Sequence, residues 1–222
     1  MKTDGLFETT TKTISKEISL GGYTVLKEAL RYPGFDTENE KFGKVCARMN
    51  AFYKSGAEKY DRFAQKTLSK KAFSQFRKTG RIMTTSMNYN ISFCDEDYIC
   101  VITDISGCDG QGAFGTRIAH TWSVESACIL PVSHFIKTDR KSIYHIKNTI
   151  IETVRKNSSN PAFGYYGDCE KRARQAFSIS NYCLLPKGLA FFIDPGVLSD
   201  AKYGPSVFVI NTQTAIDKHG KM

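Results

Sequence analysis

The hydrophobic period of the sequence changes at Gly80, and this change constrains the fold most. From Phe42 onward, apolar side chains recur three and four residues apart, which is typical of one face of a helix. From Met83 to Phe93 the alternation has a period of two, which is typical of a strand with one buried face. A chain with long runs of both periods combines helices with a sheet. We therefore expect an α+β fold in which an antiparallel sheet packs against a long helix and a second, shorter helix.

The limits of the long helix follow from local signals. Thr37 to Glu40 has the order of a capping box, and Gly80 is a natural stop. Gly43 and Gly56 each weaken a helix by about 1 kcal/mol relative to alanine, so we expect a bend or close packing near them. Before the helix, one or two strands are expected to end at Tyr32-Pro33-Gly34, because proline has no backbone donor.

The remaining elements follow from the same reasoning. Strands are expected at 98–105 and 114–124, and with 83–93 they form an antiparallel meander. A second helix begins after Asp139 and ends at Asn157. Further on we expect a short helix at 171–176, a hairpin whose strands 177–185 and 189–193 flank Pro186-Lys187-Gly188, and a last strand at 207–210. The architecture is one α+β unit over 1–222, or two closely packed subdomains at 1–80 and 81–222.

The charge balance favours anionic partners only weakly. The chain has 222 residues, with 31 Lys and Arg against 22 Asp and Glu, a net charge of +9. Aromatic residues are interleaved with basic ones only in the cluster from Lys66 to Arg81, where Phe73 and Phe76 fit a buried helical stripe. The basic clusters are therefore interpreted as solvated faces, and nucleic-acid binding is not expected.

Cysteine usage and the N-terminal residues bear on location. The seven cysteines are an odd number without disulfide-type spacing, which points to a reducing compartment. The first sixteen residues contain no apolar signal core, and no run approaches the roughly 20 apolar residues of a membrane span. We expect no membrane span, a cytoplasmic location if the chain is complete, and an extracytoplasmic one if an upstream segment was removed. The oligomeric state is not indicated.

Motifs for cofactor, metal or covalent chemistry are weak. Residues 110–115 match G-x-G-x-x-G, but strand residues follow where a dinucleotide site needs a helix, so these glycines are interpreted as shaping a bent connection. The four histidines and seven cysteines lack the spacing of zinc sites. Cys108 and Cys169 are interpreted as ordinary free thiols. We expect no catalytic residue, no metal and no cofactor.

An aromatic pair in a loop is the best candidate contact point. Tyr165 and Tyr166 stand between Gly164 and Gly167, in a stretch without regular periodicity. Aromatic residues exposed on loops are common in binding surfaces. The alternative is a loop tucked onto the core.

A resemblance to a known family is carried by short stretches in a fixed order over about residues 30 to 211. They are Tyr32-Pro33, Gly112-Ala113-Phe114-Gly115, Thr121-Trp122-Ser123-Val124, Ile129 to Ile136, Leu189, Phe191-Phe192-Ile193-Asp194-Pro195 and Tyr203-Gly204-Pro205-Ser206-Val207. Together they resemble the RsiV/PdaC-like family, a bacterial domain of unknown function found in the extracytoplasmic part of the anti-sigma factor RsiV and beside the deacetylase domain of PdaC. Phe114 stands where that family usually has a loop histidine. The resemblance implies a curved antiparallel sheet on helices and a binding or sensing role.

Two functional hypotheses follow. The first is a non-catalytic binding or sensor domain for a protein or a cell-wall-type glycan, with ligand contacts at Gly112, Phe114, Gly115, Tyr165 and Tyr166. A pocket lined by Tyr165, Tyr166 and Trp122 would suit this hypothesis and the alternative equally. The alternative is a small hydrolase or transferase acting on an anionic substrate, whose candidate residues are Asp104, Asp109 and His120. We expect the binding domain rather than the enzyme.

Overall fold

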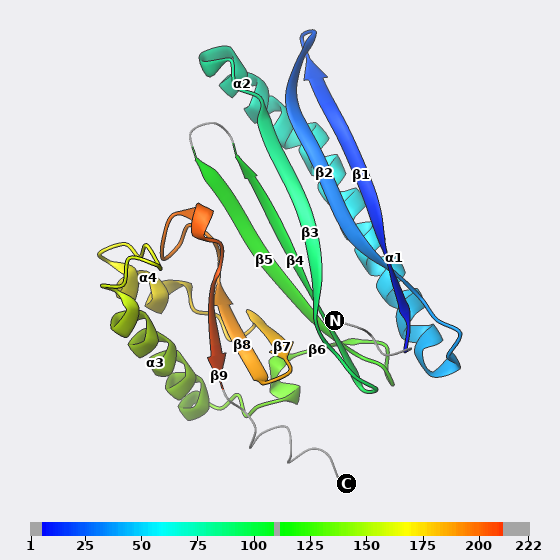
Figure 1. The fold of residues 1–222 in the computed structure, drawn as a ribbon, viewed down its shortest axis with the longest axis vertical. Helices are drawn as coiled ribbons and strands as arrows, with labels where there is room; N and C mark the ends of the chain where they lie inside the picture. Colours follow the sequence, from blue (N-terminus) through cyan, green and yellow to red (C-terminus); the bar gives the residue numbers. More distant parts are fainter. Residues whose placement is uncertain (1–5, 109–111, 211–222) are drawn as a thin grey trace.

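The computed structural model describes residues 6–108 and 112–210, and these form two sheets with helices beside them (Figure 1). The first sheet has six strands in the order β1-β2-β3-β4-β5-β6, and the second has three in the order β7-β8-β9. The elements are β1 (Glu8–Leu20), β2 (Tyr23–Asp36), α1 (Glu40–Phe63), η1 (Ala64–Leu68), α2 (Ser69–Thr79), β3 (Met83–Cys94), β4 (Tyr98–Cys108), β5 (Ala113–Ser123), β6 (Ile129–Leu130), η2 (Val132–His134), α3 (Arg140–Asn157), α4 (Cys169–Ala176), β7 (Tyr182–Leu185), β8 (Gly188–Ile193), η3 (Ala201–Tyr203) and β9 (Ser206–Ile210). The expected α+β class is confirmed.

The six-stranded sheet is strongly curled and antiparallel except at one position. The expected meander of β3, β4 and β5 is confirmed. β2 and β3 run parallel, in register from Leu26 opposite Met83 to Leu30 opposite Met87. Parallel neighbours need a long crossover, and the helical segment α1–η1–α2 provides it.

The long helical segment has the expected extent, but its N-cap residue and the position of its irregular turn differ from those expected. Asn39 is the N-cap, and its side chain accepts the N–H of Lys41 at 3.0 Å. The expected capping box at Thr37 is wrong, because the Thr37 hydroxyl accepts the Asn39 N–H instead. The α-helix continues through both glycines and departs from α geometry later, at the π-helical turn η1. Gly80 ends the segment with a φ of 68°, as expected.

The expected stop at Tyr32-Pro33-Gly34 is wrong, since β2 continues through these residues to Asp36. β3 pairs with β2 only as far as Leu30. Pro33 therefore lies in a part of β2 that is paired with β1 alone. No strand pairs with β2 on its other edge at this position, so the missing N–H of proline leaves no ladder hydrogen bond unmade on that edge.

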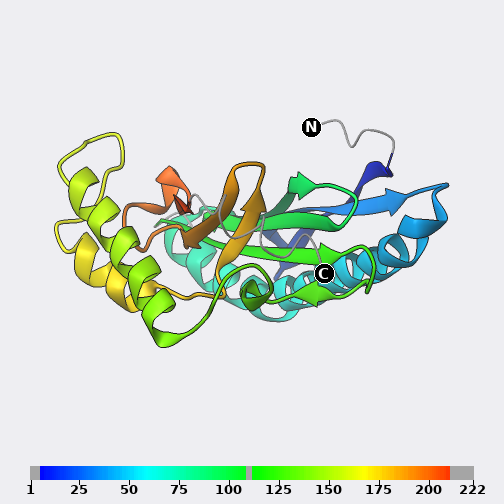
Figure 2. The same cartoon turned by 90° about the horizontal axis from the view of Figure 1, so that it is seen from below.

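The core lies on both faces of the middle strands. On one face, β4 and β5 present Ile99 and Trp122 to Phe42 and Met49 of α1. On the other face, Cys100 of β4 belongs to a cluster built from α3, α4 and the second sheet. Figure 2 shows α1 running along one side of the six-stranded sheet. The strands β1 and β2 are covered on their helix face, whereas residues of their other face are exposed.

The C-terminal half mostly follows the sequence-based expectations. The Asp139 carboxylate accepts the Ser142 N–H at 2.9 Å and caps α3, and the hairpin β7–β8 forms. β7 begins at Tyr182 rather than at Phe177, because a turn intervenes in which the Asn181 N–H donates to the Ser178 carbonyl at 3.1 Å. Among the described residues, no helix combines the length and the apolar character that a membrane span requires.

Candidate functional site

The sequence-predicted contact residues of β5 lie on opposite faces of the sheet. Phe114 faces the helices, where its ring packs onto the cluster of Val25 and Leu26 and directly over Gly107. Gly115 faces the other way, and a Cβ added there would lie 3.0 Å from Pro195. Gly112 precedes β5 and is exposed. Phe114 thus fills a structural position, since it occupies the space left by a glycine on the neighbouring strand.

The tyrosine pair is tied to the connection between β8 and β9. Tyr165 is half-buried, forms a β-bridge with Ser199, and has a pKa raised by burial. The Tyr166 N–H donates to the Leu198 carbonyl at 2.8 Å, and the Arg172 guanidinium lies 4.6 Å from the centre of the Tyr166 ring. Tyr166 remains 37% exposed. The loop is therefore tucked onto the second sheet at Tyr165 and open at Tyr166.

Some of the predicted residues come together and others do not. Gly115 and the tyrosine pair meet the same connection, residues 194–205, through Pro195 and Ser199. Trp122 lies in the core on the helix side, where its Nε1–H donates to the Tyr53 hydroxyl at 3.0 Å. Trp122 and the tyrosine pair therefore do not line one pocket.

The candidates of the enzyme hypothesis are also separated. The Asp104 carboxylate receives two hydrogen bonds of 2.7 Å from the Arg117 guanidinium, on the face that meets the second sheet. His120 lies on the helix face, 4.8 Å from the Phe52 ring centre, and burial lowers the pKa of this histidine. Asp109 lies outside the described residues. The described residues contain no cluster of three or more His, Cys, Asp or Glu side chains suited to a metal ion.

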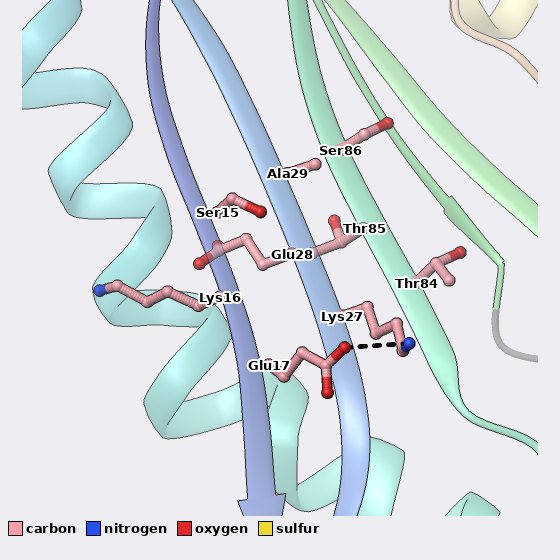
Figure 3. Close-up of a pocket in the computed structure, with 9 residues that line it drawn as sticks. All are labelled: Ser15, Lys16, Glu17, Lys27, Glu28, Ala29, Thr84, Thr85 and Ser86. Carbon is pink, nitrogen blue, oxygen red and sulfur yellow. Dashed lines mark ion pairs between the residues drawn. The ribbon is translucent and has the colours of Figure 1, made fainter.

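The open face of β1, β2 and β3 carries a groove with a volume of about 300 Å³ (Figure 3). Its lining is Ser15, Lys16, Glu17, Lys27, Glu28, Ala29, Thr84, Thr85 and Ser86. Strand register places small residues in one row across five strands: Ser15, Ala29, Ser86, Ser106 and Gly115. The row begins at the edge strand and ends where Gly115 meets Pro195. Ser15, Ala29 and Ser106 are exposed on this side, whereas Ser86 and Gly115 are half-buried.

Charged side chains flank this row on both sides. On one side, the Lys27 ammonium lies 3.0 Å from the Glu17 carboxylate, and both side chains are exposed. On the other side, register aligns Asn88 with Asp104 and Asp104 with Arg117. Arg117 is also anchored through its backbone, because the Asp194 carboxylate accepts the Arg117 N–H at 2.8 Å. The floor of the groove and of the row that extends it is therefore small and largely hydroxyl-bearing. Glu17 and Lys27 flank it at the groove, and Asp104 and Arg117 flank the far end of the row.

Beneath the groove lies a buried carboxyl group that sequence reasoning missed. Glu28 alternates with Leu26 and Leu30, so its side chain turns to the helix face, and it is 2% exposed. Neither carboxylate oxygen has a hydrogen-bond donor among the described residues. Burial, together with the neighbouring Asp61 of α1, raises the pKa of Glu28 to about 7.

Asp61, in contrast to Glu28, has a lowered pKa and is therefore ionised. Burial raises its pKa, but hydrogen bonds from Lys16 and Gln65 outweigh this effect and keep the pKa below its ordinary value. The Lys16 ammonium lies 2.7 Å from each Asp61 oxygen, and Figure 3 shows its side chain extending toward α1. The negative charge of Asp61 therefore disfavours ionisation of Glu28, and the Lys16–Asp61 ion pair links β1 to α1 just before η1. The sequence does contain a signal for this group: Glu28 stands at a position of the strand where alternation predicts an apolar, inward-facing residue.

Comparisons with known proteins concern the fold. No family model matches the sequence, and no curated protein matches it. A DUF3298 family member from Bacteroides fragilis NCTC 9343 has a similar structure, with a TM-score of 0.62 at 10% identity over 97% of this chain and 93% of that chain. A DUF3298 family protein from Pseudomonas aeruginosa PAO1 gives a TM-score of 0.60 at 9% identity over 94% and 92%. The chain therefore has a DUF3298-type fold, which is consistent with the resemblance to the RsiV/PdaC-like family.

Proposed function

We propose that this chain is a non-catalytic binding domain of the RsiV/PdaC-like type, and that its ligand is a cell-wall-type glycan bound on the open face of the six-stranded sheet. The observation that carries the proposal is the groove on β1–β3 and the row of small residues that extends it. Neighbouring strands lie about 4.8 Å apart, so a row across five strands is about 19 Å long. That length suits a chain-like ligand rather than a small compact one.

The chemistry of the floor favours a polyhydroxylated ligand. Serine and threonine hydroxyls both donate and accept hydrogen bonds, which matches the mixed donors and acceptors of sugar rings. The hydroxyl oxygens of Ser86 and Ser106 lie 3.0 Å apart, so a hydrogen bond joins these two side chains across β3 and β4. A sheet holds such groups in place before binding, which lowers the entropy lost on association. Glycan carboxylates and amides would pair with the charged side chains that flank the floor.

Calorimetry with soluble fragments from a muramidase digest of peptidoglycan tests this proposal. Ala29→Phe fills the floor of the groove at an exposed strand position, and we expect a loss of affinity of at least about tenfold. Ser126→Phe places the same ring in an exposed turn outside the groove and serves as the matched control, with unchanged affinity. Equal affinity of wild type and Ala29→Phe would contradict the proposed site.

A further inference from the structure

Most of the net charge of the chain resides in the long helical segment. Residues 40–79 contain eleven Lys and Arg against three Asp and Glu, which accounts for eight of the nine net positive charges. All eleven basic side chains are exposed: Lys41, Lys44, Arg48, Lys54, Lys59, Arg62, Lys66, Lys70, Lys71, Arg77 and Lys78. This concentration is a property of the helix and not of the whole surface.

Several of these charges are uncompensated within the part of the chain that the structure describes. Lys59 and Arg62 are one turn apart on α1, and Lys66 continues the row at η1; none of the three has an ion-pair partner among the described residues. Like charges at these spacings destabilise a helix. A solvated face does not require such a row, whereas an anionic partner would remove the repulsion.

Apolar side chains lie beside the basic ones on the flank of α1 that faces β5. Phe52 and Phe63 on α1 are 38% and 45% exposed, and Ile118 on β5 is 42% exposed. The contact of the Phe52 ring with Trp122, at 5.4 Å between ring centres, places this flank against β5. The guanidinium of Arg48 also lies on this flank, 3.4 Å from the Cys128 sulfur.

We propose that this side of α1–η1–α2 docks on the surface of an anionic lipid bilayer. A helical segment of about 40 residues is about 60 Å long, and Figure 2 shows it along one side of the molecule. Positive charge spread along such a rod matches a flat anionic surface, where each Lys or Arg adds to the attraction. The exposed phenylalanine rings can enter the boundary between headgroups and acyl chains, as in interfacial helices.

Other anionic partners fit these observations less well. A short acidic peptide would contact only a small part of the row. A nucleic acid would place phosphates against Phe63 and Ile118, whose side chains offer no hydrogen-bond donor. The groove lies on the face of the sheet opposite α1, so docking through the helix leaves it open to solvent. The inference does not depend on the proposed glycan site.

Sedimentation with vesicles tests the docking directly. The probes are vesicles of phosphatidylcholine with or without phosphatidylserine, at low and at high salt. Wild type is expected to bind only the vesicles that contain phosphatidylserine, and to bind less at high salt. The variant Lys59→Glu, Arg62→Glu, Lys66→Glu is expected to lose at least about tenfold in partitioning.

A matched variant separates a specific surface from net charge. Lys137→Glu, Lys141→Glu, Lys156→Glu makes the same charge change at exposed positions around α3, and we expect less than about a twofold loss. Phe63→Ser is expected to abolish the vesicle binding that remains at high salt, because that remainder depends on the apolar ring. Equal losses in the two triple variants would overturn the proposal. Tighter binding of duplex DNA than of vesicles, lost in the helix variant, would overturn the choice of lipid.

Discussion

Replacement of the buried Glu28 carboxyl group tests whether burial against the long helix raises its pKa. Glu28 has a pKa of about 7 in the folded chain against an ordinary value of 4.5, because burial and Asp61 favour its protonated form. The stability that this preference contributes is fully present below about pH 4.5 and is lost as the pH rises through about 7. Between pH 5 and pH 8, the free energy of unfolding should therefore fall by about 2 to 3 kcal/mol from this group. Glu28→Gln keeps the shape and cannot ionise, so it should remove this decline.

Other groups do not obscure the comparison. Burial lowers the pKa of His120, so the stability tied to that histidine is lost as the pH falls below about 6.5, which is the opposite direction. This contribution is present in both proteins and cancels in their difference. The lowered pKa of Asp61 affects stability only below its ordinary value of 3.8, outside the range measured.

Urea unfolding at pH 5, 6, 7 and 8, followed by fluorescence, measures the effect. The chain has one tryptophan, Trp122, which is buried in the helix-side core and reports its loss. Glu17→Gln, on the same hairpin but exposed, is the matched control and should keep the wild-type decline. If the stability of Glu28→Gln declines with pH as steeply as that of wild type, the account of the buried Glu28 carboxyl group is refuted.

Two further predictions concern the packing of the sheet and the start of the long helix. Gly107→Ala should destabilise the fold by about 2 kcal/mol or more, because the added Cβ would overlap the Phe114 ring and approach the Thr84 carbonyl oxygen to 2.5 Å. Thermal unfolding measures this change, and a variant as stable as wild type would contradict the packing described. Asn39→Ala should cost about 1 kcal/mol by removing the cap on the Lys41 N–H, measured by urea unfolding, with Asn39→Asp expected to retain most of the stability.

The sequence was sufficient to predict elements whose signal is local. The alternation from Met83 to Ile91 places successive residues on the two faces of β3, and a shift in register after Ile91 ends the pattern. The cap at Asp139 and the stop at Gly80 depend on neighbouring residues alone. The continuation of β2 through Pro33 could not be predicted, because it depends on where β3 stops pairing.

The site depended on contacts between distant segments. That Phe114 and Gly115 face opposite ways follows from strand alternation and was available from the sequence. The anchoring of Asp194 to β5 joins residues 77 positions apart, and no local pattern indicates it. Glu28 was visible in the apolar phase of its strand, but its partner Asp61 becomes a neighbour only when the helix packs on the sheet.

Backbone amide chemical shifts during titration with soluble peptidoglycan fragments test the proposed binding face most directly. The account predicts that the changes concentrate at Ala29, Ser86 and Ser106, which lie in one row across the open face. Changes confined to Tyr165 and Tyr166, or no changes at saturating fragment, would contradict it.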